Sequence, residues 1–159
     1  MSTTYARANL QSQTLNSVSA ATSGLTSSIL TATTNTVNWI TSNGWYADLP
    51  IAGQRSVTDA SLVNGSYINT LNTPPLSTCG SGFTSMLLDI NYATGGAFTT
   101  GQLDINNDGV INSADTYSGG FAVGVGLANS YAAAPTVLGT NSNNNTVLLI
   151  TLSNGTQLS

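Results

Sequence analysis

The densest group of ionisable side chains in this sequence lies between residues 104 and 115. Three of the six acidic residues fall in this window, whereas Asp48, Asp59 and Asp89 are scattered singly. Carboxylates held this close repel one another, by on the order of a kcal/mol per pair at the dielectric constant near a protein surface. The window therefore favours a bound cation.

The order of residues in the window matches the calcium-loop pattern D-x-[DN]-x-[DN]-G, with an acid at the twelfth place. Side-chain oxygens at positions 1, 3 and 5 converge as such a loop wraps, glycine at position 6 allows the sharp turn, and position 7 offers its backbone carbonyl. Position 9 would act through a water, and the acid at position 12 closes the far side. The predicted ligands are Asp104, Asn106, Asp108, Val110 through its carbonyl, Asn112 and Asp115.

The predicted ion is Ca²⁺, because hard oxygen donors without imidazole or thiolate suit calcium better than the small, rigid octahedron of Mg²⁺. Position 12 is Asp rather than the Glu of a helix-loop-helix sensor, and Gly119 and Gly120 follow it. Glycine propagates a helix poorly, so we expect a structural clip rather than a switch. Ile111, at position 8, is expected to point into the core. The alternative is a polar turn that binds nothing.

Composition excludes many other chemistries. The chain of 159 residues has no His, Lys or Glu, so it cannot build a Ser/His/Asp triad, an imidazole zinc site or a Schiff base. Arg7 and Arg55 are its only basic residues and its net charge is -4, which excludes nucleic acid as a partner. An aspartate-only glycosidase would need two carboxyl groups facing a cleft. Its best candidates already belong to the calcium loop, so we expect no enzyme.

The same composition indicates an extracellular, mainly β domain with little helix. Thr, Val, Ile and Tyr favour strands, while Gly and Asn supply turns. No apolar run approaches 18 residues and no signal peptide is visible, so we expect no membrane span. Cys79 is the single cysteine, which rules out a disulfide within the chain.

An antiparallel meander is the simplest arrangement of the expected strands. Asn-Gly pairs favour the type I′ turn of a hairpin, and they occur at 43–44, between Trp39 and Trp45, and at 64–65, between Val63 and Tyr67. Further strands are predicted at 86–90, 121–127 and 147–152, and Asp89 is interpreted as a turn acid. We divide the chain into a Ser/Thr-rich N-terminal arm at 1–33, either a helix or an edge strand, and a β domain at 34–159.

Several motifs resemble, in order, the C-terminal domain of the type IV pilus tip-associated adhesins, the PilY/PilC family. The matching segments are Trp39, Gly44-Trp45-Tyr46-Ala47-Asp48-Leu49-Pro50, Gly53-Gln54-Arg55-Ser56-Val57, Thr78-Cys79-Gly80, Met86-Leu87-Leu88-Asp89, Thr94-Gly95-Gly96 and the loop 104–115. The resemblance covers about residues 35–140, and the Gly-Trp-Tyr-x-Asp-Leu-Pro block is its most specific part. Gln54 stands where family members usually carry an acid, and the chain is less charged than they are.

The resemblance implies part of a modified β-propeller with a calcium loop, located at the cell surface. It implies a role in pilus extension and retraction, surface adhesion and twitching motility, with the pilus tip, its minor pilins and a host or abiotic surface as partners. The family loop has a nine-residue form and a twelve-residue form, so either Asn112 or Asp115 would close it.

A second function is left open by the composition. Thr/Asn-rich strands with open edges and little charge could pair between chains, as subunits of an extracellular fibre do. Trp39, Trp45 and Tyr46 could form a platform for a glycan, but core packing is the favoured interpretation because large aromatic side chains dominate core energetics.

Overall fold

A computed structural model describes residues 6–25, 27–75, 82–141 and 145–158. The protein is mainly β, with 45% strand and 4% helix, and the larger of its two sheets curls into a half-barrel. Helix is limited in these ranges to a 3₁₀ turn at Arg7–Asn9 and the short α1, Ala20–Ser23, neither long enough to cross a membrane. Cys79 and the Thr78-Cys79-Gly80 motif lie outside the described residues.

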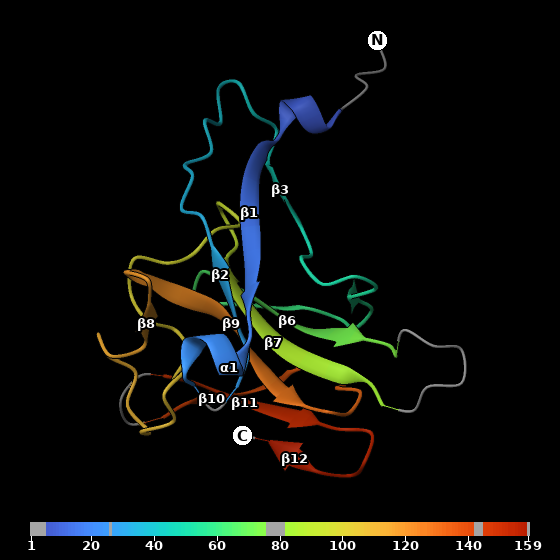
Figure 1. Cartoon of the computed structure of the whole chain (residues 1–159). Coiled ribbons are helices and arrows are strands. Elements are labelled where there is room, and N and C mark those ends of the chain that lie inside the picture. Colours follow the sequence, from blue (N-terminus) through green and yellow to red (C-terminus); the bar gives the residue numbers. More distant parts are fainter. Residues whose placement is uncertain (1–5, 26, 76–81, 142–144, 159) are drawn as a thin grey trace.

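The larger sheet has nine strands in the order β3-β1-β2-β9-β7-β6-β4, with β5 on β6 and β8 on β9. A three-stranded sheet, β10-β11-β12, lies below it in Figure 1. The bounds are β1 (Gln11–Val18), β2 (Ile29–Ala32), β3 (Trp45–Asp48), β4 (Arg55–Ser56), β5 (Ser61–Val63), β6 (Ser66–Thr73), β7 (Thr84–Asn91), β8 (Thr116–Tyr117), β9 (Gly120–Ala128), β10 (Thr136–Thr140), β11 (Thr146–Thr151) and β12 (Gln157–Leu158).

The hairpin predicted at residues 64–65 is confirmed. Asn64 and Gly65 have φ angles of 49° and 87°, which are the positive values that a type I′ turn requires at both central residues. Val63 pairs with Ser66 across the turn, so Asn64 and Gly65 alone connect β5 to β6. The strands predicted at 86–90, 121–127 and 147–152 are also present, as β7, β9 and β11.

The hairpin predicted at residues 43–44 is wrong. No strand precedes it between residues 33 and 44, where the backbone carbonyl of Asn38 accepts the amides of Thr41 and Ser42 in a local turn. Strand β3 pairs instead in parallel with β1, with Gln11 opposite Trp45. A local turn signal could not anticipate this pairing, because the partner strand lies more than 30 residues away.

The sheet is therefore not a simple meander. Besides its parallel β1–β3 pair, it places β9 between β2 and β7, so neighbours in space are distant in sequence. The segment interpreted as an N-terminal arm contributes β1 and β2 to the sheet, and β1 lies inside it rather than at its edge. The side chain of Gln13, on β1, is buried there, and its amide group donates to the carbonyls of Asn35 and Thr94, at 2.6 and 2.8 Å.

Strand β7 is buried along both faces, which explains its continuous apolar run. Leu87 packs into one core cluster, together with Ile68, Ile105 and Ile150. Met86 and Leu88 pack into a second cluster on the opposite face. The half-barrel therefore separates two apolar cores.

The three-stranded sheet is fixed to the half-barrel through β6. The Asn72 amide donates to the carbonyl of Ala132 and accepts its backbone N–H, at 3.0 and 2.8 Å. Thr70 donates its hydroxyl to the carbonyl of Ala133 at 2.9 Å, and Ala132 forms a β-bridge with Leu152. These bonds hold the second sheet against the face of the first that carries Leu87.

Trp39 is 61% exposed, so the interpretation of this residue as a core aromatic is wrong. Trp45 is half-buried, and its indole N–H donates to the carbonyl of Tyr92 at 2.8 Å. Its ring covers Gly95, where a Cβ atom would lie 2.1 Å from Trp45 Cε3. Only glycine can occupy this position, because its φ of 72° is also unfavourable for other residues.

We predict that Gly95→Ala lowers the free energy of unfolding by about 3 kcal/mol, since the added methyl group displaces the Trp45 ring and the backbone is strained. Gly65→Ala is the matched control: its φ is 87°, but no atom lies within 4 Å of the added Cβ. It should cost only about 1 kcal/mol. Urea denaturation measures both, and equal losses would show that the contact with Trp45 is unimportant.

Candidate metal centre

The loop 104–115 runs directly into strand β8 at Thr116, without a helix between them. Ile105 is 2% exposed and packs in the cluster around Leu87. The expectation that Ile111 anchors the loop is wrong, because Ile111 is only half-buried, beside Gly101. Anchoring by Ile105 puts the apolar contact next to position 1 and leaves residues 107–110 exposed at the surface.

Asp104 organises the first half of the loop. Its Oδ1 atom accepts the backbone amides of Asn107 and Asp108, at 2.6 and 3.3 Å, and its Oδ2 atom accepts the amide of Gly109 at 2.8 Å. The backbone turns sharply around this carboxylate because Asn107 and Gly109 have φ angles of 62° and 82°. Asp104 therefore lies at the centre of this turn.

Asn106 and Asp108 are joined to each other beside this turn. The Asn106 carboxamide accepts the backbone amide of Asp108 and donates to Asp108 Oδ2, both at 3.0 Å. Asp108 Oδ1 accepts the amide of Val110 at 2.8 Å. Side chains from positions 3 and 5 are thus brought together.

Asp115 closes the loop through hydrogen bonds. It is 1% exposed, its Oδ1 accepts the amides of Ile105 and Asn106 at 3.0 and 3.5 Å, and its Oδ2 accepts the amide of Asn112 at 2.8 Å. Asn112 is exposed, and its side chain donates to the carbonyl of Val110 at 3.2 Å. Asp115 therefore links residues from both ends of the loop by hydrogen bonds, whereas Asn112 donates a hydrogen bond to the carbonyl at position 7.

The donor set suits a hard cation. A carboxylate can accept about four hydrogen bonds, and Asp104 and Asp115 each accept three, so both keep acceptor capacity. Over the described ranges, no three acidic, histidine or cysteine side chains form a group that could hold a metal on its own. A cation here would also need the Asn106 carboxamide and the Val110 carbonyl, which are the ligand types the loop pattern assigns.

No basic side chain compensates these carboxylates in the part of the chain that the structure describes. The ion pair found there joins Arg7 to Asp48, and the Arg7 guanidinium lies 4.0 Å from the centre of the Tyr46 ring. Backbone amide dipoles are the partners that the loop supplies. A divalent ion would therefore reduce a repulsion among the carboxylates that no basic side chain in the described residues offsets.

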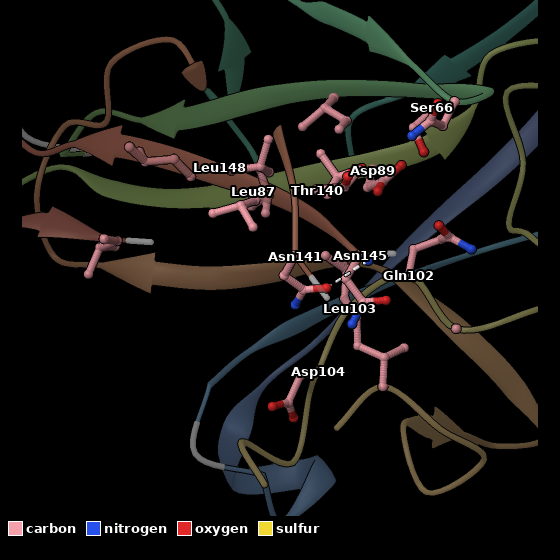
Figure 2. Close-up of a pocket in the computed structure, with 18 of the residues that line it drawn as sticks. Ser66, Leu87, Asp89, Gln102, Leu103, Asp104, Thr140, Asn141, Asn145 and Leu148 are labelled. Carbon is pink, nitrogen blue, oxygen red and sulfur yellow. Dashed lines mark hydrogen bonds between the residues drawn. The ribbon is translucent and has the colours of Figure 1, made fainter. Parts of the chain in front are cut away.

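Asp89 is a polar residue that sequence reasoning misplaced. It is not a turn acid but lies within β7, opposite Ile68, and is 7% exposed. Figure 2 shows it near Ser66, whose hydroxyl donates a hydrogen bond to it, while Asp89 Oδ1 has no partner among the described residues. The sequence signal for this burial is that Asp89 lies within the apolar run 86–90, which predicts a buried strand.

Burial raises the pKa of Asp89 from 3.8 to about 6, and the Ser66 hydrogen bond partly opposes this shift. A carboxyl group is disfavoured in its charged form when water is removed from it. Between about pH 4 and about pH 6, Asp89 is therefore protonated in the folded protein but already ionised in the unfolded chain.

We predict that the free energy of unfolding of the wild type falls relative to that of Asp89→Asn as pH rises through this window, by up to about 3 kcal/mol. Above the window, the difference in unfolding free energy between the two proteins should be constant. Urea denaturation in chelator at several pH values measures the difference without any contribution from calcium. Asp59→Asn, at an exposed acid, is the control. Parallel pH profiles for the wild type and Asp89→Asn would contradict the raised pKa.

Comparisons with known proteins identify no relative of this chain. No family model, curated protein or solved structure matches it. The chemistry of the loop 104–115 and of its surroundings is therefore the basis on which a function can be assigned.

Proposed function

We propose that this chain is a calcium-binding, non-catalytic β domain, in which the EF-hand-like loop 104–115 holds one Ca²⁺. The observation that carries the proposal is the Asp104 carboxylate, which accepts the amides of three successive residues, 107–109. This arrangement fixes position 1 at the centre of the turn and gathers positions 3 and 5 beside it. Calcium supplies the positive charge that the loop lacks.

The ion acts as a structural clip in this proposal. Calcium sensors work by changing the angle between two helices that flank the loop. Here the loop runs into β8, and Ser118 and Gly119, with φ angles of 52° and 82°, turn the chain directly into β9. Ion binding would therefore order the surface residues 106–110 against an already formed sheet.

We further propose, on the resemblance to the PilY/PilC family, that the domain acts extracellularly at the type IV pilus, in pilus assembly, surface attachment and twitching motility. Exposed apolar side chains near the resembling Gly44–Pro50 block support a binding role: Trp39, Ile40 and Tyr92 are 61%, 94% and 55% exposed. A propeller blade has four antiparallel strands, whereas the half-barrel has nine. The modified propeller would have to be completed outside these sheets.

We predict that saturating Ca²⁺ raises Tm. A hundred-fold excess over Kd adds about 2.7 kcal/mol to the free energy of unfolding, or roughly 5 to 10 °C for a domain of this length. Asp104→Asn and Asp108→Asn should each reduce the shift by weakening the ion site. Differential scanning calorimetry in calcium and in chelator measures it.

Asp59→Asn is the matched control, since it removes one exposed carboxylate outside the loop and should keep the full shift. Mg²⁺ at the same concentration should give a smaller shift, because it holds its own water more tightly. A wild-type melting curve that is identical in calcium and in chelator would refute the site.

One observation favours the alternative, a self-assembling subunit of an extracellular fibre. Strand β10 is an edge of the three-stranded sheet, four of its five residues are exposed, and Leu138 is 58% exposed. An open, apolar edge strand is a template for pairing with another chain. A bulge between Val137 and Gly139 interrupts its register, which limits continuous pairing.

Light scattering after size exclusion separates the two functions. For the pilus role, we predict a chain of constant size alone that co-elutes with purified minor pilins in calcium and not in chelator. Growth of the chain alone into larger species with concentration would instead support the fibre. Pilin binding that is unchanged by chelator would show that the loop does not support this interface.

A further inference from the structure

A cavity of about 740 Å³ lies between the half-barrel, the segment 101–111 and the three-stranded sheet. Its apolar walls come from both sheets and include Ile68, Leu87, Leu127, Leu148 and Ile150. Cavities of this size are typical of small-molecule sites, which are mostly apolar with a few polar groups that orient the ligand. Figure 2 shows Leu87 and Leu148 on one side of this space, with Leu103 and Asp104 on another.

The Asp89 carboxylate is one of several polar groups in the wall, which also include Ser66, Gln102, Asp104 and Asn145. It lies on the same face of β7 as Leu87, two residues away, and so lines the cavity rather than the second core. Asp89 is 7% exposed, and its Oδ1 atom has no hydrogen-bond partner in the described residues. A buried acceptor without a donor is costly, so this position favours a ligand that brings one.

The charges around the cavity are all of one sign. Asp104 lines it as well as Asp89, whereas neither Arg7 nor Arg55, the only basic residues of the chain, does so. Carboxylates next to apolar walls concentrate a negative potential that attracts cations and repels anions. A ligand with a positive charge and an apolar body would match both parts of the wall.

We propose that this cavity binds a small organic cation, a protonated primary amine with an apolar chain, whose ammonium group donates to Asp89 and whose chain packs against Leu87, Leu148 and Ile150. The ammonium group supplies the donor that the carboxylate lacks. The chain replaces water along the apolar walls. The calcium loop contributes Asp104 to the cavity wall, but the ammonium group is placed on Asp89, which takes no part in ion binding.

The test uses isothermal titration calorimetry on the full chain saturated with Ca²⁺, so that Asp104 is committed to the loop. The probes are n-hexylamine, 1-hexanol and hexanoate, which share one chain and differ in charge. We expect the amine to bind at least tenfold more tightly than the alcohol and hexanoate not to bind. In the series from butylamine to octylamine, each methylene should raise affinity about three- to fourfold until the cavity is full.

Asp89→Asn should weaken amine binding at least tenfold and leave alcohol binding unchanged, whereas Asp59→Asn should change neither. Equal affinity for amine and alcohol, or amine binding that survives Asp89→Asn, would overturn the proposal. No binding of any probe would also overturn it and would mean that internal water alone serves Asp89. The calcium-induced Tm shift of Asp89→Asn keeps the two proposals distinct, since it should equal that of the wild type.

Discussion

The burial of β7 on both faces is the constraint on which the other features depend. Leu87 and Asp89 face the three-stranded sheet, whereas Met86, Leu88 and Ile90 face the second core. Because side chains alternate along a strand, a shift of register by one residue would exchange these sets and place the carboxylate in the second core. The eight paired positions between β6 and β7 fix that register.

Because the chain has few basic side chains, most of its carboxylates have no cationic side chain to pair with. With two arginines against six aspartates, most acids must be stabilised by backbone amides, hydroxyl groups, water or bound cations. Asp115 uses three amides to close the loop, while Asp89 is left with Ser66 and a raised pKa. Of the two buried acids, Asp115 has hydrogen-bond donors for both oxygens, whereas Asp89, which lines the cavity, keeps one buried oxygen without a donor among the described residues.

Local signals predicted the parts of the fold that are formed by residues close in sequence. The turn at Asn64-Gly65 was predictable because its positive φ angles are intrinsic to those residues, and β7 and β9 because of their apolar patterns. Within the loop 104–115, the Asp104 carboxylate lies at the centre of a turn and accepts the amides of residues 107–109. The same kind of signal failed at Asn43-Gly44, where the preceding residues form no strand and β3 pairs with β1.

The sequence by itself determined the oxygen donors at fixed spacing in one loop, the lack of imidazole and lysine amine groups, and the turn at residues 64–65. Tertiary structure decided where these atoms lie. It placed β1 between β2 and β3, made Ile105 rather than Ile111 the apolar anchor, and buried Asp89 beside a cavity. The physical reason is one of range, since turns and ligand spacing arise within a dozen residues, whereas burial depends on which distant strands oppose each other.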